Sequence, residues 1–400
     1  MSYTENSIFT ANTTMLDAFG NLKVSNPFTL FDAKQIHDNL PLHFDDQETS
    51  GSGTSSTFVI ADAKSVLAVA NLTAGKRVRQ SFRCLNYQPG KSQEIAITGN
   101  INDKESGITK QVGYFEDDNG IFFEASDDFY FGIRKNGVDR KIAIADWTFN
   151  GVAWADSGYT MDFTKVQIFI FDMEWLGVGS VRFGFQLDGL PVYAHAEHHA
   201  NTTYTDVYMQ SPNLPIRYSI ENDGTGGISE LDTICCVVKS AGGQQEAGQT
   251  RAIDRGTTSF STGNNTSIHP LLSFRLRSGW EGATINTIKA SIICTSNADF
   301  RWVLIVNPTI AGVDAVSWVT LSDAAIEYDI SRTNVNTLSG GFQLISGYGN
   351  KASDIVTPAT ISTIRPGVAI DGTADEFILA VQNMSSINET YYASLVIQES

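Results

Sequence analysis

The chain has 400 residues, of which 42% are hydrophobic, so it can build packed cores and is not a disordered polymer. Its 27 Lys and Arg residues against 44 Asp and Glu residues give a net charge of −17, which argues against a nucleic-acid partner because phosphate attraction needs clustered basic residues. No apolar run reaches the roughly 18 residues of a membrane-spanning helix, and the first residues lack the basic and apolar regions of a secretory signal.

In chain order, residues 1–56 are expected to form an extended N-terminal arm and linker that ends in the flexible run Gly51–Ser56. Apolar residues occur in this arm without a regular period, so we expect the arm to lack a core of its own. Such a segment docks either on its own domain or on a neighbouring subunit. The candidate interface residues of the arm are Phe19, Leu22, Val24, Phe28, Leu30 and Phe31.

Residues 57–240 are predicted to form a first β-sandwich. Asn-Gly and Asp-Gly pairs supply the positive φ angles of tight hairpins, and they recur at 119–120, 136–137, 150–151, 188–189, 223–224 and 371–372. Apolar residues alternate over 181–187 and over 192–196, on either side of Asp188-Gly189, which predicts a β-hairpin. The run 165–175 is apolar on both faces at first, as is typical of a central strand.

Residues 241–400 begin with a Gly-rich break and are predicted to form a second β-sandwich domain. Helical periodicity of useful length is nearly absent from the whole chain. The fold class is therefore all-β, with two sandwich domains of the concanavalin-like or jelly-roll kind. The strands expected in the second domain are 274–277, 285–295, 301–306, 342–346, 377–382 and 392–397.

Two carboxylates occur on the predicted central strand, where period 2 places Ile170, Asp172 and Glu174 on one face. The segment is similar to the catalytic strand of family-16 glycoside hydrolases, which are concanavalin-like sandwiches with a Glu-x-Asp-x-Glu pattern. Ile170 stands where that pattern has its nucleophile, so the resemblance implies the fold and argues against the activity. Binding of a glycan or ion by Asp172, Glu174 and Trp175 is one interpretation, and a structural role is the other.

A second candidate site is His195, Glu197 and His199, which we expect on the strand face opposite the apolar 192–196 positions. These ligand types suit Zn²⁺ or another divalent metal. The alternative is a polar or interface face with hydrogen-bonded histidines. No other cofactor is expected. The tryptophans, Trp280 among them, are expected in cores or interfaces, although an exposed ring could stack on a sugar.

Several segments of the central region carry a further resemblance. They are 87–92 (YQPGKS), 113–120 (GYFEDDNG), 174–185 (EWLGVGSVRFGF), 199–201 (HAN) and 212–222 (PNLPIRYSIEN), together with the opening 17–24 (DAFGNLKV). Together these segments resemble a group of virion proteins of tailed bacteriophages and large viruses that is widespread in aquatic viruses.

The resemblance implies a non-enzymatic virion structural protein, on the capsid surface or associated with the portal or tail. Such a protein would be made in the host cytoplasm and would assemble, as a homo-oligomer, with other virion proteins. Four cysteines without a CxxC pair are compatible with a reducing compartment. The alternative function is a carbohydrate-binding protein or a degenerate glycoside hydrolase that recognises host surface polysaccharide. Neither nucleic acid nor membrane is an expected partner.

Overall fold

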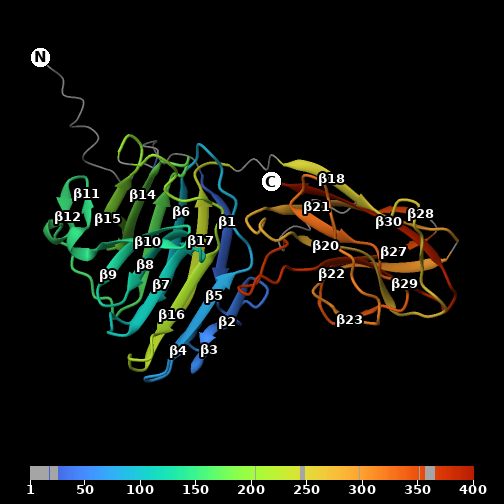
Figure 1. Cartoon of the computed structure of the whole chain (residues 1–400), viewed down its shortest axis with the longest axis horizontal. Helices are drawn as coiled ribbons and strands as arrows, with labels where there is room; N and C mark the ends of the chain where they lie inside the picture. The colour runs from blue at the N-terminus through green and yellow to red at the C-terminus, as the bar shows by residue number, and fades with distance from the viewer. Residues whose placement is uncertain are drawn as a thin grey trace, which may run out of the picture. The chain divides into compact units, whose positions relative to one another are not determined.

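The computed structural model describes residues 18, 26–202, 204–243, 248–296, 298–350, 352–355 and 365–400. The chain divides into two compact units between residues 245 and 246. Figure 1 shows the strands of the first unit in blue to yellow-green and those of the second in yellow to red. Nearly all described elements are β-strands, which confirms the all-β fold class. The described helical elements are the short 3-10 turns η2 (Ile144–Asp146) and η3 (Trp154–Asp156), and none could cross a membrane.

The first unit contains two antiparallel sheets. The eight-stranded sheet has the order β15-β14-β13-β6-β17-β4-β3, and β1 pairs with β17 beside it. Its strands are β1 (Phe28–Lys34), β3 (Thr54–Val59), β4 (Lys64–Val69), β6 (Gln93–Asn100), β13 (Gln167–Met173), β14 (Ser180–Leu187), β15 (Leu190–His198) and β17 (Ser229–Ser240). β6 alternates between buried and half-buried residues along its whole length, as a strand with one face on the core must.

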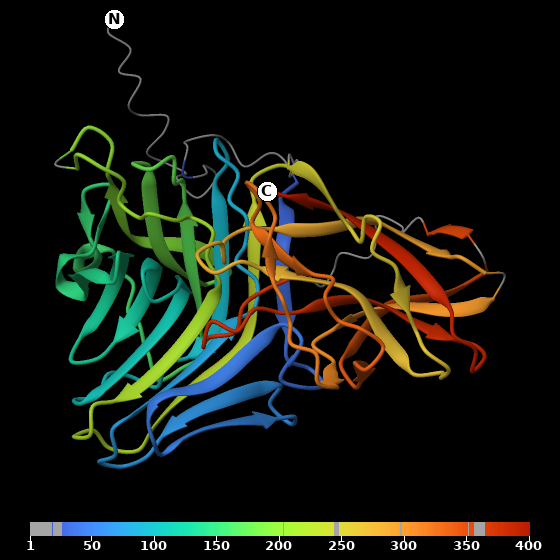
Figure 2. The same cartoon turned by 45° about the vertical axis from the view of Figure 1, so that its right-hand side comes forward.

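The seven-stranded sheet has the order β10-β9-β8-β7-β16-β5-β2, and its strands bend along their length (Figure 2). These strands are β2 (Phe44–Gly51), β5 (Gly75–Ser81), β7 (Ile108–Phe115), β8 (Asn119–Ala125), β9 (Phe129–Lys135), β10 (Val138–Ala143) and β16 (Ile216–Asn222). A small hairpin of β11 (Thr148–Phe149) and β12 (Val152–Ala153) forms a two-stranded sheet of its own beside β15.

One hydrophobic core joins residues from both sheets of the first unit, which makes this unit a β-sandwich. Phe123 of β8 is fully buried at its centre. The ring centroid of Phe123 lies 5.0–6.2 Å from those of six other aromatic residues, which are Phe129, Phe131, Trp147, Phe163, Phe169 and Phe185. Aromatic packing of this density supplies much of the apolar area that holds a sandwich together.

The predicted hairpin is confirmed: β14 and β15 flank the two-residue turn Asp188-Gly189, and both turn residues have positive φ. Asn136-Gly137 and Asn150-Gly151 form the same kind of turn. Asn119-Gly120 behaves differently, because it begins β8 and the chain reverses before it. The dipeptide alone predicts a turn there, whereas Gly120 pairs with Phe115 of β7 and Asn119 pairs with Lys135 of β9.

The described part of the predicted arm belongs to the first unit. β1, β2 and the first half of β3 lie within residues 28–56, and all three pair with strands of the two sheets. Phe31 is buried and packs edge-on against Phe44, Leu30 is half-buried against the core, and Phe28 is 44% exposed. Residues 28–56 therefore dock on their own domain, which is one of the two expected alternatives, but they do so as strands of its sheets rather than as an arm outside them. Phe19, Leu22 and Val24 lie outside the described residues.

The second unit is also a sandwich of two antiparallel sheets, with the orders β18-β30-β21-β28 (β19 beside β30) and β24-β25-β20-β29-β22-β27. All six predicted strand regions are found as strands. The bounds are β18 (Gln249–Asp254), β19 (Phe260–Ser261), β20 (Ile268–Leu276), β21 (Ile285–Cys294), β22 (Asp299–Val306), β23 (Thr309–Ala311), β24 (Val319–Thr320), β25 (Ile326–Asp329), β26 (Thr337–Ser339), β27 (Phe342–Asn350), β28 (Ala352–Ile355), β29 (Phe377–Asn383) and β30 (Thr390–Glu399). Its core is separate from that of the first unit.

Candidate functional site

Asp172 lies on β13 and is fully buried. Phe171 and Met173 point into the core, so Asp172 lies on the opposite face of the eight-stranded sheet. Its carboxylate accepts hydrogen bonds from Arg182 Nη2 at 2.6 Å and from the Tyr193 hydroxyl at 2.9 Å. Burial and the adjacent carboxylate raise the pKa of Tyr193, which keeps the phenol protonated as a donor. A carboxylate enclosed in this way holds neighbouring strands together.

Glu174 follows directly after the end of β13. Its carboxylate Oε1 accepts a hydrogen bond from the Ser180 N–H at 3.1 Å, and its own N–H donates to the Ser180 carbonyl at 2.9 Å. These two bonds close the turn between β13 and β14. Asp172 and Glu174 thus each have protein partners of their own, and a binding role for this pair stays a prediction.

A β-bulge changes the predicted face of His195. β14 and β15 pair Phe183 with His195 but Gly184 with Tyr193, so Ala194 is an extra residue in β15. The extra residue turns His195 to the same side as the core residue Phe183. The expectation that His195 faces away from the core is therefore wrong, because a bulge resets the alternation of the strand.

His195 and Glu197 form a hydrogen-bonded pair near the strand end. His195 Nδ1 accepts a bond from the Thr148 N–H at 3.1 Å, so Nε2 carries the proton and donates to Glu197 Oε1 at 3.0 Å. Arg140 of β10 forms a salt bridge with Glu197 as well. Burial alone would raise the pKa of Glu197, but the His195 hydrogen bond and the Arg140 guanidinium outweigh it and lower the pKa to about 2.

His199 lies beyond the end of β15 and has different neighbours. Its Nδ1 is 2.6 Å from the Gly179 carbonyl, so Nδ1 carries the proton, and its ring stacks on Tyr208 with 4.1 Å between centroids. The structure thus does not bring the three predicted ligands, His195, Glu197 and His199, to one point. Among the described residues, no three His, Cys, Asp or Glu side chains are grouped so as to hold a metal ion.

The segments 87–92, 113–120, 174–185, 199–201 and 212–222, which carry most of the virion-protein resemblance, meet at one end of the first unit, whereas the opening 17–24 lies outside the described residues apart from Ala18. Trp175 connects two of them: its backbone N–H donates to the Tyr87 hydroxyl at 3.0 Å, and its indole Nε1–H donates to the Met209 carbonyl at 2.8 Å. Tyr87 in turn is held by Asn213, whose Oδ1 accepts the Tyr87 N–H at 2.9 Å. We call this set of contacts the end-loop network.

Two buried tyrosines extend the end-loop network. The Tyr114 hydroxyl lies 2.8 and 2.9 Å from the carbonyl oxygens of Leu85 and Pro212, and the Tyr208 hydroxyl donates to the Glu174 carbonyl at 3.1 Å. Sequence reasoning missed Tyr208, because it lies in an irregular stretch with no periodic pattern. In this network the polar groups are bound to the main chain, which fixes loop shape.

Lowering the pH is expected to loosen the end-loop network, because His199, whose ring stacks on Tyr208 of this network, would take up a proton. Burial lowers the pKa of His199, although the bond to Gly179 partly opposes this shift. Nε2 of His199 is buried without a hydrogen-bond partner, so an added proton there would have no acceptor. Because the unfolded chain takes up this proton more readily, stability is lost as the pH falls from about 6.5 toward the folded-state pKa. Hydrogen exchange of residues 174–180, measured by mass spectrometry across this range, should show increasing opening.

The matched variants for this prediction are His199→Gln and His37→Gln. Glutamine retains a donor for the Gly179 carbonyl but does not titrate, so we expect the pH dependence of exchange at 174–180 to shrink in His199→Gln. His37 is exposed, and its replacement should leave the dependence as in the wild type. An undiminished pH dependence in His199→Gln would contradict the assignment.

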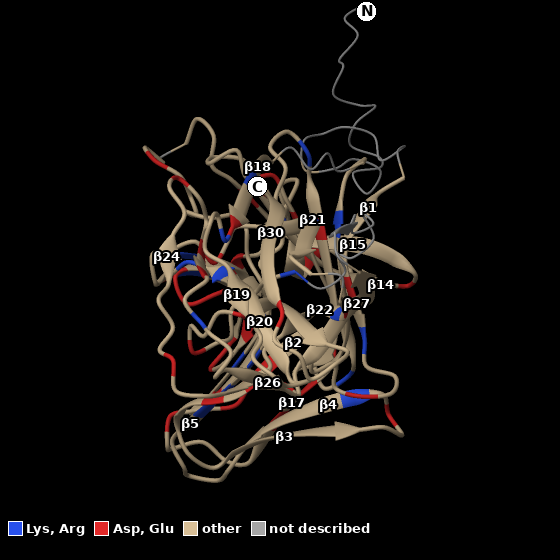
Figure 3. Ribbon diagram, turned by 90° about the vertical axis from the view of Figure 1, so that its right-hand side faces the viewer, with Lys and Arg blue, Asp and Glu red and all other residues tan. Residues whose placement is uncertain are grey.

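Many charged side chains in the first unit form hydrogen bonds and ion pairs within the unit. Glu124 of β8 is fully buried and accepts hydrogen bonds from Gln111 at 2.8 Å, Ser126 at 2.8 Å and Lys141 at 2.7 Å. In the part of the chain that the structure describes, Lys and Arg are spread over many elements among Asp and Glu (Figure 3). Internal pairing of this kind stabilises strands against one another without creating a charged binding surface.

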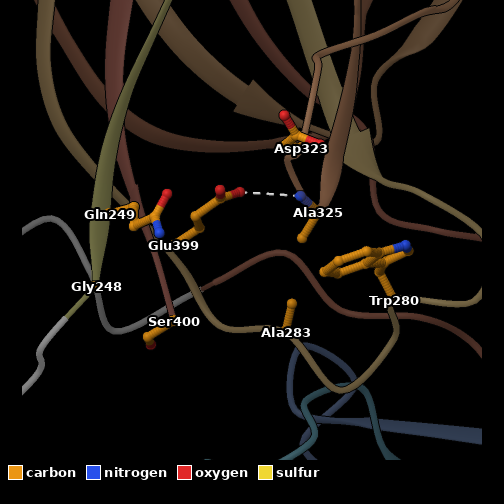
Figure 4. A pocket seen from close by; sticks show the side chains of 8 residues that line it. All are labelled: Gly248, Gln249, Trp280, Ala283, Asp323, Ala325, Glu399 and Ser400. Atoms are coloured by element: carbon orange, nitrogen blue, oxygen red, sulfur yellow. Dashed lines mark hydrogen bonds between the residues drawn. The ribbon is translucent and has the colours of Figure 1, made fainter.

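The second unit contains an open pocket of about 610 Å³ (Figure 4). The side chains of Trp280 and Ala283 form one wall, and those of Gln249 and Glu399 face them, with Asp323 above. The lining residues are Gly248, Gln249, Trp280, Ala283, Asp323, Ala325, Glu399 and Ser400. Trp280 is 45% exposed, which excludes a core position for it and agrees with the other two positions expected for the tryptophans, an interface or stacking on a sugar.

No protein-family model matches the sequence, and no curated protein is significantly similar to it. Similar solved structures include a protein of unknown function from Shewanella oneidensis MR-1, with 12% identity and a TM-score of 0.35 over 62% of this chain and 98% of that one. A glycoside hydrolase family protein from Mycobacterium thermorestibile shares 11% identity, with a TM-score of 0.36 over 52% and 99%. The CBM2 module of the evolved Dit of Lactobacillus casei BL23 phage J-1 shares 8%, with a TM-score of 0.35 over 55% and 98%.

Proposed function

We propose that the chain is a non-enzymatic structural protein of a tailed-bacteriophage virion, on the capsid surface or at the portal or tail. The observation that carries this proposal is the end-loop network. Those segments resembling virion proteins that the structure describes come together there, and their polar groups bind main-chain atoms. A network of this kind serves to keep a surface in a fixed shape, which a repeating assembly needs.

The two candidate reaction sites support the same proposal. Asp172 is enclosed by Arg182 and Tyr193, and Glu197 is held between His195 and Arg140. A group that acts as acid, base or nucleophile must be reached by its substrate. Their pairing therefore favours a structural role.

In this proposal, contacts with other virion proteins and with further copies of the chain are made by the sandwich faces and by residues 1–25. Residues 28–51 contain β1 and β2, and removing them would take two strands from the sandwich. We therefore assign attachment to residues 1–25, which precede these strands. A test that separates attachment from folding must therefore leave residues 26–56 in place.

The decisive experiment is mass spectrometry of gradient-purified particles of the encoding virus, with the copy number scaled to the major capsid protein. We expect a fixed stoichiometry, and chemical cross-links from Lys23 to other virion proteins. A small count typical of a symmetric ring would indicate the portal or tail, and hundreds of copies would indicate shell decoration. Absence of the chain from particles would overturn the proposal.

A further inference from the structure

We propose that the Trp280 pocket of the second unit binds a neutral saccharide. This inference is independent of the proposed place in a virion, because it rests on the pocket alone. The pocket volume of about 610 Å³ falls in the range of about 300–1,000 Å³ that small-molecule sites occupy. Its walls combine one exposed aromatic ring with fixed hydrogen-bonding groups, which is the chemistry that a sugar ring requires.

Trp280 supplies the aromatic wall. Its side chain is 45% exposed, whereas Trp147, Trp154 and Trp302 are at most 7% exposed. The main chain of the turn that carries this ring is closed by hydrogen bonds from the Trp280 N–H to the Arg277 carbonyl and from the Ala283 N–H to the Trp280 carbonyl, both 3.0 Å. The Arg277 guanidinium lies 4.8 Å from the ring centroid. An indole, which has only two rotatable side-chain bonds, offers the apolar C–H face of a sugar a large contact area at little entropic cost.

The polar wall, which faces Trp280, consists of Gln249 and Glu399, and Arg251 holds both by hydrogen bonds. Its Nε donates to Glu399 Oε1 at 3.1 Å, and its Nη2 donates to Gln249 Oε1 at 2.6 Å and to the Asp323 carbonyl at 2.9 Å. Glu399 Oε2 also accepts the Ala325 N–H at 2.9 Å (Figure 4). These bonds fix Glu399 and Gln249 before any ligand arrives, which lowers the cost of binding.

The fixed groups still have hydrogen-bonding capacity left. A carboxylate has about four acceptor positions, and Glu399 uses two of them within the protein. Gln249 uses its Oε1, which leaves its NH₂ group as a donor. Asp323 adds a second carboxylate at an exposed turn position. The wall therefore offers both acceptors and donors, and sugar hydroxyls can satisfy both.

The charged groups of the pocket and of the whole chain determine whether a neutral or an anionic saccharide binds better. Asp323 and Glu399 are acidic, and they are matched by two guanidinium groups: Arg251 pairs with Glu399, and Arg277 lies over the Trp280 ring. With a chain net charge of −17, an anionic sugar would enter against repulsion. Among the described residues no acidic group of three is positioned to hold a bridging metal ion. The pocket thus favours an uncharged ligand.

The test is a titration of the purified full chain with neutral oligosaccharides of glucose, mannose, galactose, xylose and N-acetylglucosamine, with oligogalacturonate as the anionic probe. Saturation-transfer NMR and tryptophan fluorescence report binding. We expect at least one neutral probe to bind with a Kd below about 10 mM, and oligogalacturonate to bind more weakly. No binding of any neutral probe, or a preference for the anionic one, would overturn the proposal.

Three variants locate the site. Trp280→Ala and Gln249→Ala are expected to weaken binding roughly tenfold or more and roughly threefold, respectively. Tyr348→Ala removes an aromatic ring that is 72% exposed on β27 and should leave binding unchanged. A variant is folded if the hydrogen exchange of its strands β21 and β22 equals that of the wild type. If Trp280→Ala does not fold, Gln249→Ala still tests the site. Binding unaffected by the substitutions at 280 and 249 in folded protein would also overturn the proposal.

Discussion

The Asp172→Asn variant is expected to be less stable than the wild type by about 3–5 kcal/mol, because it removes the negative charge of a buried ion pair with Arg182. Arg182 is 7% exposed and its Nη2 lies 2.6 Å from the Asp172 carboxylate. Asparagine keeps the shape of the side chain, so the loss would reflect charge rather than a cavity. Hydrogen exchange of amides in β13 and β14 of the full chain gives the free energy of opening for this sheet.

The matched control is Asp206→Asn. Lys135 Nζ and the Asp206 carboxylate also lie 2.6 Å apart, but the Asp206 side chain is 68% exposed. Water screens this pair, so its loss should cost less than about 1 kcal/mol. Equal effects of the two substitutions would show that burial does not decide the strength of the Asp172 pair. If Asp172 instead served catalysis or binding, its replacement would change activity with little change in stability.

The second large effect is expected for Phe123→Ala, which should destabilise the first unit by about 3–5 kcal/mol. Phe123 is fully buried and touches rings from β9, β13 and β14 as well as Trp147 and Phe163. Its removal leaves a cavity that rigid neighbouring rings cannot close. Exchange in β8 should rise strongly, while exchange in β21 and β22 of the second unit should not change, because that unit has a separate core.

Phe28→Ala provides the comparison for a phenylalanine of the same unit at the surface. Phe28 is 44% exposed on β1, and we expect its loss to cost less than about 1 kcal/mol. A rise in exchange throughout β21 and β22 of Phe123→Ala would mean that the two units unfold together. A small effect of Phe123→Ala in β8 would contradict the central position of this ring in the core.

The sequence predicts the strands well where the signal is local. The turn Asp188-Gly189 lies between two alternating segments, and both its residues adopt the expected positive φ. Turn chemistry and alternation act over a few residues, so they can be read without knowing the neighbours of a strand. The same local reading fails at Asn119-Gly120, where pairing with β7 and β9 outweighs the turn preference of the dipeptide.

The candidate sites are less predictable because they depend on contacts between distant residues. His195 has the residue type of a metal ligand, but the bulge at Ala194 decides which way it points. Asp172 has the residue type of a catalytic acid, but Arg182 and Tyr193 on the next two strands decide that it is enclosed. Neither the bulge nor the enclosure has a sequence pattern of its own.

The sequence by itself determined the all-β class, most strands and the central hairpin, since period-2 alternation and turn residues express their preferences locally. Only the tertiary structure decided that residues 28–56 complete the first sandwich, that the resembling segments form one end-loop network, and that Gln249, Trp280, Asp323 and Glu399 line one pocket. The physical reason is that side chains far apart in the sequence become neighbours only when the order and register of the strands are set.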